Sequence, residues 1–71
     1  MNVTEAMEKA DTVAHVQIDS VVYKRFEASI KRSQPIKYYE RHNPADVGYY
    51  DIIHAVAGLP GEANFYLRRI A

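Results

Sequence analysis

The sequence predicts a small α+β domain whose helices pack on a three-stranded sheet. Three stretches alternate apolar with polar residues, as half-buried strands do, and the stretches before and between them repeat apolar residues at helical spacing. The predicted order is α-β-α-β-α-β over one domain, residues 1–71. Strands separated by helices favour parallel neighbours and right-handed crossovers. We therefore expect the second and third helices to cover one face of the sheet.

The first two predicted elements are a short helix and a strand. Asn2, with Glu5 three residues later, has the form of a capping box that begins a helix. Residues 12–18 then alternate and are rich in β-branched residues, which indicates a strand with one buried face. The side that we expect to be buried carries Ala14, Val16 and Ile18.

The second predicted helix, residues 21–33, has an apolar side and a basic side. Asp19 or Ser20 can cap its first turn. The apolar side carries Val22, Phe26 and Ile30. The basic side carries Lys24, Arg25, Lys31 and Arg32. Same-sign charges grouped on one helical arc attract phosphate, so these four are candidate nucleic-acid-binding residues, with an ordinary solvated surface as the alternative interpretation.

Two further strands are predicted from alternation at residues 36–41 and 63–70. The face of the sheet turned away from the helices would then display His15, Gln17, Lys37, Tyr39, Arg41, Asn64, Tyr66 and Arg68. Tyrosine and arginine are enriched at protein interfaces. The candidate partner-binding residues are Tyr39, Tyr66, Lys37, Arg41 and Arg68. The tyrosines expected in the core are Tyr23, Tyr38 and at least one of Tyr49 and Tyr50.

Residues 43–61 form the third predicted helix, and this segment carries the clearest start and stop signals. Asn43 can cap the first turn, and Pro44 suits the first helical position. Gly58 can adopt the left-handed conformation that ends a helix, and Pro60 cannot continue one. Apolar residues fill a wide arc of the helical wheel, so we expect this helix to be buried against more than one neighbour.

The sequence contains no recognisable catalytic or cofactor-binding motif. Asp51 and His54 are spaced to ligate a metal from one helical face, but a local hydrogen-bonded pair is the stronger interpretation. The glycines at residues 58–61 are followed by Glu62 rather than by the Lys-Ser/Thr of a phosphate-binding loop. We therefore expect no enzymatic activity, no metal and no cofactor.

Composition and charge narrow the function classes further. The formal net charge is zero, yet residues 21–42 are basic and the segments on either side are acidic. This distribution disfavours a nonspecific nucleic-acid coat protein and leaves room for one basic patch. The chain has no cysteine, and no stretch reads as a signal peptide or a membrane span, so a cytoplasmic protein is expected.

The first functional hypothesis is a small interaction protein that binds a protein or nucleoprotein complex and modulates or inhibits it. Its size, the lack of catalytic motifs and the aromatic-basic face favour this interpretation. Small inhibitors encoded by phages or mobile elements share these general properties. This hypothesis predicts a partner that is acidic, or a nucleoprotein whose nucleic-acid site is blocked. A homodimer would compensate for the small core of such a chain.

The alternative hypothesis is a homodimeric DNA-binding transcriptional regulator. Val16, Gln17, Ile18 and Asp19, followed by the helix from Val21, resemble the start of a ribbon-helix-helix protein. That resemblance implies a strand that pairs between two chains and reads the major groove with its outward side chains. Those outward side chains would be Val13, His15 and Gln17.

Overall fold

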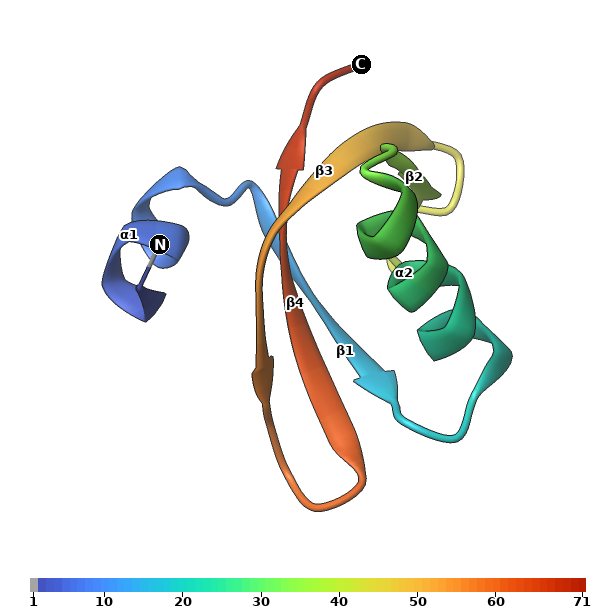
Figure 1. Cartoon of the computed structure of the whole chain (residues 1–71). Helices are drawn as coiled ribbons and strands as arrows, with labels where there is room; N and C mark the ends of the chain where they lie inside the picture. The colour runs from blue at the N-terminus through green and yellow to red at the C-terminus, as the bar shows by residue number, and fades with distance from the viewer. Residues whose placement is uncertain (1) are drawn as a thin grey trace.

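In the computed structural model, which describes residues 2–71, two helices lie on opposite faces of a curled four-stranded antiparallel sheet (Figure 1). The elements in chain order are α1 (Val3–Lys9), β1 (Thr12–Gln17), α2 (Val21–Arg32), β2 (Ile36–Tyr38), β3 (Gly48–Ala57) and β4 (Glu62–Arg69). The strand order across the sheet is β1-β4-β3-β2, so β1 and β2 form its edges. The α+β class is confirmed. The three-stranded sheet and its parallel pairing were wrong.

The largest correction concerns residues 43–61, which contain the strand β3 in place of the third helix. The start signals belong to a turn, in which the Asp46 N–H donates to the Asn43 carbonyl at 3.1 Å. The stop signals belong to the β3–β4 hairpin, where the Gly58 N–H donates to the Glu62 carbonyl at 2.9 Å. A short hairpin can join only antiparallel strands, which explains why the expected parallel crossover does not form.

Strand β3 contains an irregularity that changes which of its residues face α2. The register with β4 shifts between Ile52 and His54, so Ile53 is the extra residue of a β-bulge. Before the bulge, Tyr50 belongs to the core under α2, and the partly buried Ile52 packs against that core. After it, Ala55 pairs with Phe65 and Ala57 with Ala63, which places these alanines on the same face. That face therefore changes from large to small side chains along one strand.

The two helices begin as their caps predict. The Asn2 side chain accepts from the Glu5 N–H at 2.8 Å, and the Ser20 hydroxyl accepts from the Tyr23 N–H at 3.1 Å. Helix α2 ends because Ser33 adopts a left-handed conformation with φ 52°. Strand β1 pairs with β4 of its own chain, which differs from the pairing between chains that the ribbon-helix-helix alternative requires.

The main core lies between α2 and the sheet, with Phe26 at its centre. The Phe26 ring is 4.9 Å from that of Phe65 and 5.9 Å from that of Tyr38, measured between centroids. The buried set is Ala14, Val16, Phe26, Ile36, Tyr50, Phe65 and Leu67, with Tyr23 and Tyr38 packed against it. The core positions expected for Ala14 and Val16 are confirmed, whereas Ile18 lies beyond the end of β1 and is 48% exposed.

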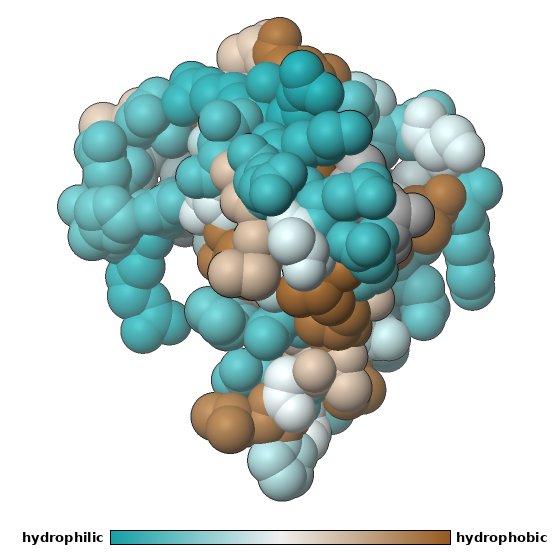
Figure 2. All heavy atoms as spheres, turned by 90° about the vertical axis from the view of Figure 1, so that its left-hand side faces the viewer, coloured by the Kyte–Doolittle hydropathy of each residue, from teal (hydrophilic) through white to brown (hydrophobic). Residues whose placement is uncertain are grey.

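The opposite face of the sheet is partly covered by α1, which contacts β3 and β4 (Figure 1). Ala6 of this helix is fully buried, and Tyr66, which alternates with the core residues Phe65 and Leu67, is only 9% exposed. From the α1 side, hydrophilic residues dominate the upper surface and hydrophobic residues form a narrower band through the middle and lower part (Figure 2). The expected open face is therefore only partly available to a partner.

Candidate functional site

The groove between α2 and the edge strand β2 brings several basic side chains together. We name it the α2–β2 groove. It consists of two adjoining hollows of about 340 and 250 Å³ that share Arg25 and Lys37. The first hollow is lined by Val22, Arg25, Phe26, Lys37, Tyr38, Tyr39 and Arg41. The second continues past Arg32 to the segment between α2 and β2.

Four basic side chains surround the α2–β2 groove: Arg25, Arg32, Lys37 and Arg41. Within residues 2–71, none of the four lies within ion-pair distance of a carboxylate. Arg25 instead donates to the backbone carbonyl of Lys37 at 3.3 Å, which connects the helix to the edge strand. Uncompensated positive charge around a concave surface produces a local positive potential although the whole chain has zero net charge.

The floor of the α2–β2 groove is apolar and aromatic. Val22 is 41% exposed there, Phe26 closes the bottom, and Tyr38 packs edge-on against Phe26. Burial raises the pKa of the Tyr38 hydroxyl, and the nearby Glu40 and Tyr50 raise it further. The Tyr38 hydroxyl therefore stays neutral near pH 7 and adds no negative charge to the groove.

The loop that carries Tyr39 and Arg41 is attached to the sheet at two places. The Thr12 hydroxyl of β1 donates to the carboxylate of Glu40, which stands between Tyr39 and Arg41 in the sequence. Farther along, the Arg69 guanidinium of β4 pairs with the Asp46 carboxylate at 3.0 Å, and this hydrogen bond raises the pKa of Arg69. These contacts position the loop beside α2, and Tyr39 is left 52% exposed.

The structure divides the two sets of candidate residues predicted from the sequence and recombines them. It brings together Arg25 and Arg32 from the basic helix and Lys37, Tyr39 and Arg41 from the predicted aromatic-basic face. Lys24 and Lys31 lie on the other flank of α2, where Lys31 pairs with Glu27 at 3.7 Å.

The remaining two candidates, Tyr66 and Arg68, lie on β4, away from the α2–β2 groove. Tyr66 is buried, which corrects its expected exposure. Arg68 is exposed on the far face of the sheet, in register with Asp51. The sequence reasoning missed Val22 and Tyr38 as groove residues because it assigned both to the core. The sequence did contain one signal for the groove, because Val22 lies one turn before Phe26 and next to the basic arc of the helix.

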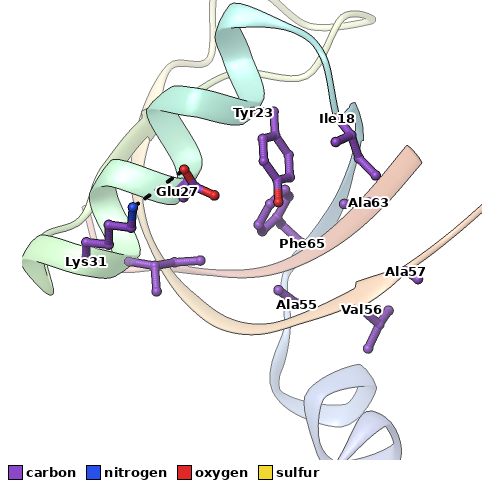
Figure 3. Close-up of a pocket in the computed structure, with 10 residues that line it drawn as sticks. Ile18, Tyr23, Glu27, Lys31, Ala55, Val56, Ala57, Ala63 and Phe65 are labelled. Atoms are coloured by element: carbon purple, nitrogen blue, oxygen red, sulfur yellow. Dashed lines mark ion pairs between the residues drawn. The ribbon is translucent and has the colours of Figure 1, made fainter. Parts of the chain in front are cut away.

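A second concave surface, the apolar cleft, lies between the other flank of α2 and the β3–β4 hairpin (Figure 3). Its volume is about 430 Å³. The rings of Tyr23 and Phe65 form its inner wall, and Ala55 and Ala57 lie across from α2. The ion pair between Glu27 and Lys31 stands at the helix side of the opening. Apart from this ion pair, the cleft is lined by apolar and aromatic side chains.

The histidines and carboxylates of residues 2–71 are the candidate metal ligands of this chain. Among these residues, no group of three or more histidine, aspartate or glutamate side chains is arranged to hold a metal ion. His42 pairs with Glu40 at 3.1 Å, and His15 lies 2.8 Å from the Asn64 side-chain oxygen. Asp51 and His54, expected on one helical face, instead lie on either side of the β3 bulge.

Comparisons of this chain with protein-family models, with curated proteins and with solved structures found no match. Within residues 2–71, neither helix has the length and apolar character needed to cross a membrane. Function is therefore inferred from the two concave surfaces described above.

Proposed function

We propose that this chain is a small non-enzymatic binding protein that contacts an acidic surface of a protein partner through the α2–β2 groove and thereby modulates the partner. The observation that carries this proposal is the ring of four basic side chains, unpaired with carboxylates within residues 2–71, around an apolar floor. An acidic partner surface would supply the missing counter-charges.

The anatomy of the groove favours a protein partner over a nucleic acid. Protein interfaces combine an apolar centre with a polar rim and are enriched in tyrosine and arginine. Val22 and the edge of Tyr38 supply the apolar centre, and Arg25, Arg41 and the exposed Tyr39 supply the rim. A site for a phosphate backbone needs the charges but not the apolar floor.

Single-stranded nucleic acid is the second candidate ligand, and Tyr39 is the observation that favours it. Tyr39 is 52% exposed and lines the same hollow as Arg41, and a base stacked on an aromatic ring gains about 1–3 kcal/mol. Binding by four basic groups would weaken with salt, with a slope of log K against log salt of up to about −3 for a single strand.

The decisive experiment compares two double variants of the same helix that remove the same charge. Arg25→Gln with Arg32→Gln removes the positive charge from the groove side of α2. Lys24→Gln with Lys31→Gln removes the same charge from the other flank. The probes are a fluorescent Asp/Glu-rich peptide and single- and double-stranded oligonucleotides, followed by anisotropy at about 50 and about 200 mM salt. We expect the arginine variant to bind the acidic peptide at least about tenfold more weakly and the lysine variant to bind nearly as wild type does.

Three other outcomes contradict the proposal. Equal losses in the two double variants would mean that the general charge of α2 matters and the groove does not. Binding of the oligonucleotide but not of the peptide, with steep salt dependence and loss in Tyr39→Ala, would select the nucleic-acid candidate. Absence of binding to every probe at low salt would remove the α2–β2 groove as an acidic-ligand site.

A further inference from the structure

The apolar cleft and its edge together carry both parts of a self-complementary surface. The cleft is a hollow whose far side is made of Ala55 and Ala57, whose small side chains leave room above the strand. On the α2 side, Ile30 lines the same cleft and is 46% exposed, so it protrudes where the alanines recede. A twofold interface needs such a patch, in which a protrusion of one copy fits a hollow of the other.

The two charged side chains at the opening of the apolar cleft are also self-complementary. Glu27 and Lys31 lie one turn apart on α2, with their charged atoms 3.7 Å apart and both side chains substantially exposed. If two α2 helices pass each other in opposite directions, Glu27 of one copy faces Lys31 of the other, and the reverse pair forms at the same time. A rim with one unit of each sign offers little to a strongly charged partner but matches a second copy of itself.

We propose that two copies of this chain form a twofold-symmetric dimer through the apolar cleft. In this dimer the two α2 helices run antiparallel, and Ile30 of each copy occupies the hollow over Ala55 and Ala57 of the other. The Glu27 and Lys31 side chains pair across the interface. The exposed Ile18, which also lines the cleft, is covered in the same contact.

A dimer through the apolar cleft would leave the α2–β2 groove free. A standard interface buries about 800 Å² on each partner. The chain exposes 5032 Å² in total, so such a contact would cover roughly a sixth of its surface. The cleft uses the flank of α2 that carries Glu27 and Lys31, whereas the α2–β2 groove uses the flank that carries Arg25 and Arg32. Both surfaces can therefore be occupied at once, and the dimer would present two basic grooves. The proposed dimer stands independently of what the grooves bind.

The test is a charge-exchange experiment on the full chain, with oligomeric state measured by analytical ultracentrifugation over a wide concentration range. Lys31→Glu places two acidic groups on the rim, and Glu27→Lys places two basic groups there. We expect wild type to dimerise, each variant alone to dimerise at least about tenfold more weakly, and an equimolar mixture of the two variants to recover dimers. Recovery in the mixture also shows that both variants are folded.

An independent pair of variants tests the apolar part. Ile30→Glu should abolish the dimer, and Ile70→Glu, a matched control at a residue that is 51% exposed near the C-terminus, should leave it intact. Circular dichroism of both variants checks that they fold. The proposal is overturned if wild type stays monomeric at every concentration, or if its dimer withstands Ile30→Glu. A monomer whose cleft binds an apolar dye such as anilinonaphthalene sulfonate, with loss of dye binding in Ile30→Glu, would assign the cleft to a small apolar ligand instead.

Discussion

Replacing Phe26 with leucine should measure how strongly α2 is attached to the sheet. Phe26 is 1% exposed, and its ring contacts the rings of Phe65 and Tyr38 at centroid distances of 4.9 and 5.9 Å. Each such aromatic pair contributes about 0.5–1.5 kcal/mol beyond the area that it buries. Leucine keeps most of the apolar volume but loses both pairs. We therefore expect the free energy of unfolding to fall by about 1–3 kcal/mol.

The change is measurable because a domain of this size has a total stability of roughly 4–10 kcal/mol. The chain has no tryptophan, so urea unfolding is best followed by far-ultraviolet circular dichroism. With an m-value of about 1 kcal/mol per molar urea, the midpoint should fall by about 1–3 M. The control is Tyr49→Leu, which also replaces an aromatic ring with leucine but at a residue that is 48% exposed, with an expected effect within about 0.5 kcal/mol. If Phe26→Leu costs no more than this control, the aromatic contacts do not hold the helix.

Three further predictions concern two glycines and one tyrosine. A Cβ at Gly48 would lie 2.7 Å from the Arg69 side chain, so Gly48→Ala should lower the free energy of unfolding in urea by about 1–3 kcal/mol; no loss would mean that Arg69 moves away freely. Gly61 has φ +80° with open space around it, so Gly61→Ala should cost about 1–2 kcal/mol in the same assay from backbone strain alone, and a neutral result would contradict the left-handed turn. Burial first, then Glu40 and Tyr50, raises the pKa of Tyr38, so the folded chain binds this proton more tightly than the unfolded chain. Its contribution to stability is complete below about pH 10 and is lost as the pH rises above that value; unfolding midpoints in this range should fall less for Tyr38→Phe than for wild type, and parallel declines would refute the assignment.

The elements that the sequence predicted correctly are those whose local signals and tertiary roles agree. Ser20 is the cap of α2 in the structure, and Phe26 faces the core as its helical spacing required. Alternation located β1, β2 and β4, although β2 is shorter than expected and ends at Tyr38. Tyr39 and Arg41 were assigned to this strand, and they lie instead in the loop after it, where they line the α2–β2 groove.

The β3 segment was predicted wrongly because its bulge disguises the strand period. The residues on the α2 face are Tyr50 and Ile52 before the bulge and Ala55 and Ala57 after it. The extra residue turns a spacing of two into a mixture of two and three, which resembles a helical repeat. Tyrosines, isoleucines and valine in this stretch favoured a strand, but the turn signals on either side were interpreted as helix caps.

Half of the candidate site depended on tertiary contacts that no local pattern contains. The helical period placed Lys24, Arg25, Lys31 and Arg32 in one arc, and only the position of β2 separates the arginines from the lysines. Tyr66 has the alternation of an outward residue, yet it is buried on the face that α1 partly covers, where its ring lies 5.9 Å from the His54 ring of β3. Pairing between distant segments therefore decided which predicted residues share a surface.

The shortness of β2 also bears on aggregation through the edge of the sheet. An edge strand offers unpaired backbone groups to any other extended chain, and charged residues or short length limit that pairing. Strand β2 has three residues with Lys37 at its centre. The Lys37 carbonyl already accepts a hydrogen bond from the Arg25 side chain. The end of the sheet nearest the α2–β2 groove is thus a poor template for fibril growth, so a partner can be recruited there by side chains without the edge recruiting further copies of the chain.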